Sequence, residues 1–307
     1  MSSKLKINPN GTHEFILQQN NIILSSSSSW TRSKEQIKKN LFIIGLAWIF
    51  LFTAFQAMAN LQSSLNSDDG LGTTSLSTIY ITLVISCAFL PPLVIDRLGL
   101  KWSIVASQFM YLLYLAANIY PKYYTLLPSA VVVGIGAGPL WTAKCTYLTE
   151  IAGFYAVLSQ ENVEVVVNRF FGYFFTMFQT SQIIGNLISS SILKPAELND
   201  SQNIVVSDKS RLSCGSLDCP LKNGLTDQIA SSIKRPQLST VYTLCAVYVS
   251  LALSSIVLIV LFLNSYVTPR RNNKTSNVSK YALLTSTLKQ ITNKHQLLII
   301  PLTLWLV

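Results

Sequence analysis

Few residues in this chain have types and spacings that could do chemistry. The two histidines, His13 and His295, lie far apart in polar surroundings, and Cys214 and Cys219 have no histidine nearby to complete a zinc site. The sequence assembles neither a metal cluster nor a catalytic triad or dyad. It therefore predicts a protein that is not an enzyme, with no catalytic, cofactor-binding or metal-binding residues.

Residues 131–150, VVVGIGAGPLWTAKCTYLTE, combine closely spaced glycines with one lysine. A glycine-rich loop that binds a dinucleotide follows a strand and opens a solvent-facing helix. Here the glycines lie inside the uncharged block 124–143, where a membrane permits only helix. Gly134 and Gly138 instead form the G-x-x-x-G pair that lets a neighbouring helix approach closely. We therefore predict that these glycines serve helix packing.

The lysine in this stretch, Lys144, has two open interpretations. Its long side chain could reach the lipid headgroups from the end of the span, at little cost. Alternatively, it could face the interior of the helix bundle, paired with an acid such as Glu150 or lining a water-filled route. The second interpretation would make Lys144 a cavity or partner-binding residue.

A polar stripe runs along the block 170–193. Its members recur at spacings of three or four residues and are Gln179, Gln182, Asn186 and Ser190. In lipid, such a stripe faces other helices or a cavity. Gln182 and Asn186 are therefore candidates either for hydrogen bonds between helices or for a cavity lining.

The elements that position these residues are membrane helices. Of 307 residues, 50% are hydrophobic and only 12% are charged, whereas about a quarter is usual in soluble proteins. The chain contains six uncharged blocks, which are residues 41–60, 76–95, 102–120, 124–143, 170–193 and 238–263. Each block is long enough to cross a bilayer as a helix. The fold class is therefore predicted to be an all-α polytopic membrane protein.

The basic residues indicate the orientation of the chain. The net charge is +10, but lysines and arginines stand between apolar blocks and form no basic patch with interleaved aromatics, which argues against nucleic-acid binding. Fifteen of them fall on the side of the N-terminus and seven on the other side. The positive-inside rule then places the N-terminus in the cytoplasm. We expect a multi-pass protein of the plasma membrane.

This orientation puts the long loop 194–237 outside the cell or in a lumen. The loop contains the sequon Asn199-Asp200-Ser201 and the cysteines Cys214 and Cys219. We therefore expect a glycan on Asn199 and a disulfide between the two cysteines, because such a compartment is oxidising.

The remaining segments are polar or short. Residues 1–40 are expected to be a disordered cytoplasmic tail, and residues 264–295 a cytoplasmic linker. The apolar block 296–307 has 12 residues, whereas a span needs about 20. It is either a short re-entrant segment or the start of a seventh helix in a fragment or truncated form of a longer protein.

The connection 92-PLVIDRLGLK-101 is either a simple charged turn or a functional motif. Asp96, Arg97, Gly99 and Lys101 resemble the inter-helix motif of the major facilitator superfamily, an acid followed by a base, a glycine and a base. Pro92 replaces the first glycine of that motif, and Leu100 replaces one of its bases. The resemblance implies that the acid pairs with neighbouring helices and latches a cytoplasmic gate.

Three longer stretches carry a closer resemblance. They are 60-NLQSSLNSDDGLGTTSLSTIY-80, 139-PLWTAKCTYLTEIA-152 and 171-FGYFFTMFQTSQIIGNLISS-190. They resemble the signature segments of the uncoordinated-ninety-three (unc ninety-three) family, and most of all its A-type homologues, over roughly residues 40–305. The resemblance implies a major facilitator fold of twelve helices, of which this chain would supply the N-terminal six-helix half and the start of helix seven. It also implies regulation of ion channels, particularly potassium channels, or escort of receptors.

Two functional hypotheses are therefore open: a channel regulator built on a transporter scaffold, and a secondary solute transporter. Coupled transporters commonly carry acids within their spans, and none of the six uncharged blocks contains one. This difference favours the regulator.

Overall fold

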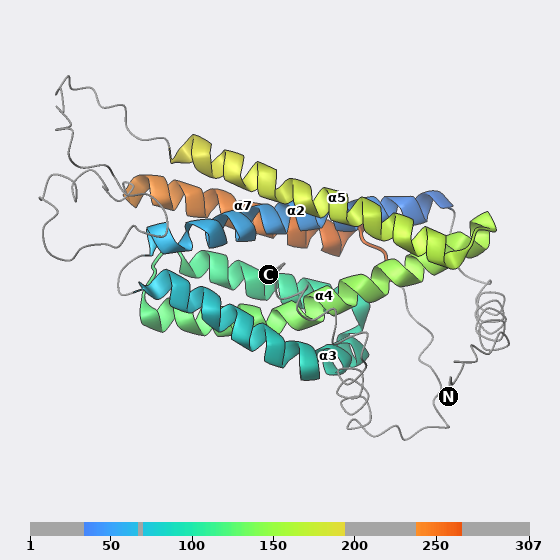
Figure 1. Cartoon of the computed structure of the whole chain (residues 1–307), viewed down its shortest axis with the longest axis horizontal. Coiled ribbons are helices and arrows are strands. Elements are labelled where there is room, and N and C mark those ends of the chain that lie inside the picture. Colours follow the sequence, from blue (N-terminus) through green and yellow to red (C-terminus); the bar gives the residue numbers. More distant parts are fainter. Residues whose placement is uncertain (1–33, 67–69, 194–237, 266–307) are drawn as a thin grey trace, which may run out of the picture.

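A computed structural model describes residues 34–66, 70–193 and 238–265, and these form an elongated bundle of helices (Figure 1). The helices are α2 (Lys34–Leu65), α3 (Leu71–Ala117), α4 (Tyr123–Ser159), α5 (Val163–Ile192) and α7 (Leu238–Phe262). The described ranges contain no strand, so the prediction of an all-α fold is confirmed. Of the described helices, α2, α3, α4 and α7 are long and apolar enough to cross a membrane.

Helix α3 consists of two arms that fold back on each other (Figure 1). The hydroxyls of Ser75 and Tyr114 lie 3.3 Å apart, although 39 residues separate them and would span about 58 Å in a straight helix. The chain reverses at Gly99, whose φ of 75° and ψ of 171° belong to a region that is essentially restricted to glycine. The predicted span 76–95 therefore lies in the first arm of α3, and residues 102–117 of the predicted span 102–120 lie in the second arm.

The helices extend beyond the predicted spans where charged residues begin. Helix α2 starts at Lys34, inside the segment 1–40 that was expected to be a disordered tail, and that boundary is wrong. The reason is that Ile37 is fully buried and Lys38 bonds to Glu35 at 3.3 Å, so the first turns are anchored. Helix α4 likewise continues past residue 143 to Ser159.

Helix α4 packs closely against the first arm of α3 through its glycines. A Cβ added at Gly134 would lie 2.6 Å from the Cβ of Thr82, and one added at Gly138 would lie 2.6 Å from Oγ of Ser86. The Ser86 hydroxyl donates a hydrogen bond of 2.6 Å to the carbonyl of Ile135. The close approach of the two backbones therefore depends on the absence of side chains at these two glycines.

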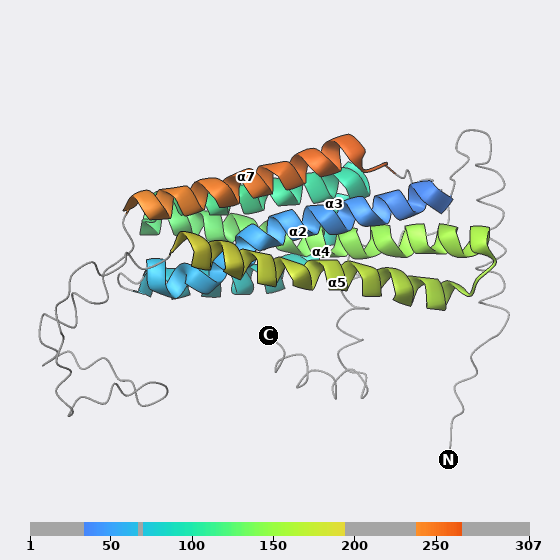
Figure 2. The ribbon, with the colours of Figure 1, turned by 90° about the horizontal axis from the view of Figure 1, so that it is seen from above.

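Helix α2 is joined on either side to α5 and α7 (Figure 2). Thr53 of α2 donates a hydrogen bond of 3.4 Å to the carbonyl of Ser181 in α5. Ser255 of α7 donates a hydrogen bond of 2.7 Å to the carbonyl of Ala47 in α2. These bonds satisfy polar side chains between helices, where lipid offers no alternative partner.

The reversal of α3 and the C-terminal end of α7 lie toward the same end of the bundle as the start of α2, and α4 extends past them on that side (Figure 1). Nζ of Lys101 donates to the carbonyl of Val260 at 2.8 Å, and the hydroxyl of Tyr147 donates to the carbonyl of Asn264 at 3.2 Å. We call this the Gly99 end. At the opposite end, the amide of Gln62 donates to Tyr114 and to Asn118 at 2.9 and 2.7 Å.

Several predicted features lie outside the described residues. These are Asn199, Cys214, Cys219, the linker 264–295 beyond residue 265, and the block 296–307. The glycan, the disulfide and the partial seventh helix therefore stay predictions.

We predict that Gly138→Ala destabilises the bundle by about 1–3 kcal/mol, because the new methyl group would overlap Ser86 of α3. Gly172 of α5 is a matched control, since nothing lies within 4 Å of a Cβ at that position. Gly172→Ala should be neutral or should add up to about 1 kcal/mol from helix propensity. Thermal unfolding of both variants in detergent measures the difference, and equal stability of the two would contradict the close α3–α4 contact.

Candidate functional site

Aromatic rings from four helices form a layer at the centre of the bundle. The ring of Phe52 in α2 lies 5.8 Å from Tyr111 of α3, 5.4 Å from Trp141 of α4 and 5.0 Å from Phe178 of α5, measured between centroids. These separations and tilted geometries are those of favourable ring pairs. The aromatic layer, defined by these four residues, therefore fixes the position of the neighbouring turn of each helix.

Lys144 follows Trp141 by one helical turn and points into the bundle. Its side chain is fully buried, with 0% exposure. Its Nζ lies 4.3 to 5.5 Å from four ring centroids, and these rings form an aromatic cage. The cage consists of Trp141 (4.7 Å), Phe171 (5.5 Å), Phe174 (4.3 Å) and Phe175 (5.0 Å).

The cage offsets only part of the cost of burying this ammonium group. Nζ of Lys144 has no hydrogen-bond partner among the described residues, and Glu150 is therefore not bonded to it. A buried, unpaired charge costs several kcal/mol, whereas a desolvated cation–π contact returns about 2 kcal/mol or more. The structure thus places Lys144 in the interior, and the lysine does not extend to the bilayer surface.

Two more buried polar groups lie at the same level and were not singled out from the sequence. Trp48 stands one turn before Phe52 in α2, and Gln108 stands one turn before Tyr111 in α3. Both side chains are fully buried, and neither the indole Nε1 nor the carboxamide has a hydrogen-bond partner in the described part of the chain. Together with Lys144 they form a polar layer, one turn from the aromatic layer toward the Gly99 end.

The polar layer is unusual because each buried polar group without a partner costs about 1–3 kcal/mol. Native proteins keep few such groups, and each calls for an explanation such as a functional role or a bound water. In the sequence, each of these polar residues stands three or four positions from a ring of the aromatic layer, and this spacing is the signal that could have identified them. That signal becomes readable only when the facing helices and their register are known.

On the other side of the aromatic layer lies a hollow of about 260 Å³ between α2, α3, α4 and α5. Its rings include those of the aromatic layer, and its polar side chains are the carboxamides of Gln56, Asn60 and Gln182. Nδ2 of Asn60 donates to Oε1 of Gln182 at 3.4 Å and to Oδ1 of Asn186 at 3.2 Å. The polar stripe of α5 therefore bonds to α2, and one member, Gln182, also lines the hollow.

The residues of the predicted gate motif lie at the Gly99 end. Asp96 and Arg97 are exposed, and no hydrogen bond or ion pair joins the Asp96 carboxylate to another described residue. Lys101 instead anchors α3 to α7 through the carbonyl of Val260. Gly99 provides the reversal itself.

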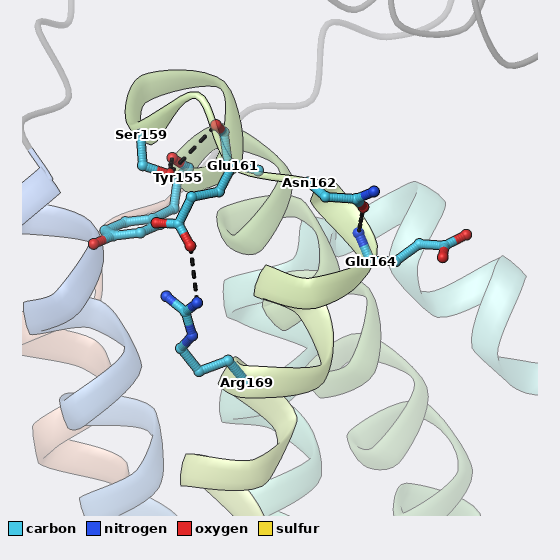
Figure 3. Close-up of polar contacts among 7 residues, drawn as sticks. Tyr155, Ser159, Glu161, Asn162, Glu164 and Arg169 are labelled. Carbon is cyan, nitrogen blue, oxygen red and sulfur yellow. Dashed lines mark hydrogen bonds and ion pairs between the residues drawn. The ribbon is translucent and has the colours of Figure 1, made fainter.

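An ion pair that the sequence did not single out joins the α4–α5 connection to α5 at the same end (Figure 3). Arg169 donates to the carboxylate of Glu161 at 2.8 Å, eight residues away across the turn. This hydrogen bond holds the pKa of Glu161 below its ordinary value. The side chain of Asn162 accepts from the backbone N–H of Glu164 at 2.9 Å and so caps α5.

In the ranges that the structure describes, no three His, Cys, Asp or Glu side chains gather closely enough to hold a metal ion. The helices, the aromatic cage and the hydrogen bonds between helices define a multi-pass integral membrane protein.

The chain belongs to the UNC-93 family. Residues 63–306 match the family model described as ion channel regulatory protein UNC-93. The chain is 41% identical over 272 residues to protein unc-93 homolog A of Xenopus laevis and 35% identical over 269 residues to that of Homo sapiens. Each match covers 87% of this chain and 57% of the relative.

A third relative is unc-93 of Caenorhabditis elegans, by its name a candidate potassium channel regulatory protein. It is 36% identical over 273 residues, which is 89% of this chain and 38% of the relative. The chain thus spans about half the length of the A-type relatives and less of the worm protein.

We predict that Lys144→Met stabilises the protein by about 1–4 kcal/mol, because methionine fills the aromatic cage without a buried charge. Lys122→Met is a control at an exposed lysine, the N-cap residue before α4, and should leave the unfolding temperature unchanged. Thermal unfolding in detergent measures both. A loss of stability in Lys144→Met would mean that the cation–π contacts outweigh the cost of burial.

Proposed function

We propose that this protein is a non-enzymatic regulator that binds an ion channel, specifically a potassium channel, within the membrane. Support comes from the family, which is described as an ion channel regulatory protein, and from the name of the worm relative. The observation that carries the choice of regulator over transporter is the lining of the hollow. It contains no Asp, Glu, Lys, Arg or His, whereas coupled transport commonly relies on ionisable groups inside the membrane.

We further propose that the scaffold is the N-terminal six-helix half of a major facilitator fold. The six spans would be α2, the two arms of α3, α4, α5 and α7, with the start of a seventh helix at 296–307. Helix α5 would be a span despite its polar stripe, because α2 covers part of that stripe through Asn60. The exposed motif at Asp96 and Arg97 would be available to a cytoplasmic segment that latches against it.

The Gly99 end is proposed to face the cytoplasm of the plasma membrane, with the N-terminus on that side. Its basic residues are Lys34, Lys38, Lys39, Arg97, Lys101 and Arg169, whereas Lys122 is the basic residue at the opposite end of the described bundle. This asymmetry agrees with the positive-inside rule.

Lys144 is proposed to be a residue through which a bound channel is regulated. Its charge costs stability, and its aromatic cage joins α4 to α5. Proteins retain such costly groups mainly where function requires them. A change in how α4 and α5 pack would alter the membrane face that meets the channel.

The alternative is a solute transporter of the major facilitator superfamily, and one observation favours it. The hollow combines carboxamides with aromatic rings, which could hold an uncharged solute. Uptake measured in vesicles that contain the purified protein distinguishes this alternative, because a regulator moves no solute by itself.

The test of the proposed function is co-expression of the full chain with potassium channels, one from each structural class. We expect at least one channel to co-purify with the protein and to change its current by several-fold. Lys144→Met should abolish most of the change in current at equal surface expression, while Lys122→Met should retain it. Absence of both co-purification and current change for every channel, together with solute uptake in vesicles, would establish the alternative.

A further inference from the structure

We propose that the hollow between α2, α3, α4 and α5 is a binding site for a small uncharged aromatic molecule that carries a carboxamide or an equivalent donor and acceptor pair. This goes beyond channel regulation and does not depend on it, because the site lies within this chain. Three features of the hollow define the ligand, namely its rings, its amide groups and its charge.

The rings set the shape and apolar character of the ligand. Six aromatic side chains line the hollow, namely Phe52, Phe55, Tyr80, Tyr111, Trp141 and Phe178. Phe55 packs edge-on against Tyr111 at 4.9 Å, and Trp141 packs edge-on against Phe178 at 5.4 Å, so the walls are fixed by ring contacts. The volume of about 260 Å³ lies just below that of typical ligand pockets, about 300–1,000 Å³. A hollow of this volume limits the ligand to a small molecule, of roughly two fused rings.

The amide groups set the polar end of the ligand. Asn60 donates through Nδ2 to Gln182 and Asn186, which leaves Oδ1 of Asn60 as an acceptor and Nε2 of Gln182 as a donor. No described residue bonds to either atom. Both residues line the hollow, so a primary carboxamide can accept from Gln182 and donate to Asn60.

The charge around the hollow favours a neutral ligand. An aromatic box often binds a cation, but here the ammonium of Lys144 already lies 4.7 Å from the centroid of Trp141, which forms one wall. A second cation on the other side of that ring would be repelled across a medium of low dielectric constant. An anion would have to shed its water without a charged donor in the lining, which is costly.

The test compares three probes of one shape and different charge, 2-naphthamide, 2-naphthoate and 2-naphthamidinium. Binding of each radiolabelled probe to the purified full chain in phosphatidylcholine nanodiscs is measured, with empty nanodiscs subtracted for partition into lipid. We expect 2-naphthamide to bind at least tenfold more tightly than either charged probe. Tighter binding of 2-naphthoate or 2-naphthamidinium would overturn the proposal.

Two variants locate the binding. Ala59→Phe fills the hollow and should weaken 2-naphthamide binding at least tenfold, whereas the matched change Ala88→Phe, at an exposed position of α3, should leave it unchanged. Gln182→Leu keeps the size of the side chain and removes the donor, so it should weaken binding several-fold. If Ala59→Phe does not fold, Gln182→Leu alone tests whether the probe binds in the hollow.

Equal binding by the parent and by folded forms of these two variants would show that the probe partitions elsewhere, and the proposal would fail. No channel is present in this experiment. Failure of the ligand site and failure of the proposed channel regulation are therefore separate results.

Discussion

The structure depends on one constraint, which is that hydrocarbon offers no partner for a polar group. Helices α3 and α4 are therefore joined by close backbone contact, and α2 is joined to α5 and to α7 by hydrogen bonds between helices. Gly134 and Gly138 bring α4 against α3, and Ser86 donates to the carbonyl of Ile135, which Pro139 leaves without an N–H partner in the helix. Thr53 and Ser255 join α2 to α5 and α7 through hydrogen bonds to carbonyls.

Lys144 is a charged exception to this constraint. Thr53, Ser86 and Ser255 donate to carbonyls, whereas no described residue forms a hydrogen bond with the ammonium of Lys144, which lies among ring faces. Trp48 and Gln108 repeat the pattern one turn from the aromatic layer on two other helices. The three polar groups of the polar layer have no hydrogen-bond partner and therefore lower the stability of the bundle. A protein retains such a cost mainly where function requires it. The hollow, by contrast, holds amides that are only half used, which is typical of a binding site.

The sequence predicted the helices well because the bilayer constraint acts on single segments. Uncharged blocks of about 20 residues revealed α2, both arms of α3, α4 and α7, and the glycine of the 92–101 connection marked the reversal at Gly99. The helix ends were less predictable. A criterion based on charge stops at the first ionisable residue, whereas α2 begins at Lys34 because Ile37 is buried there.

The candidate site was predictable only in part. Lys144 and Gln182 could be named because a lysine and a polar stripe in apolar surroundings are conspicuous in a single segment. The polar layer could not be predicted, because it arises from the register of three helices that are distant in sequence. The ion pair between Glu161 and Arg169 depends in the same way on the geometry of the α4–α5 turn. Local pattern thus identifies candidates, and packing decides which of them meet.

The most direct test of the central claim is the rate at which each lysine is modified in the folded protein. Reductive methylation in nanodiscs, followed by mass spectrometry, compares Lys144 with the exposed Lys34, Lys38, Lys39 and Lys122. A lysine enclosed by the aromatic cage should be methylated last, and only at the rate at which the bundle opens. Methylation of Lys144 as fast as that of Lys122 would show that the ammonium reaches water, and would contradict a buried charge held by the rings of α4 and α5.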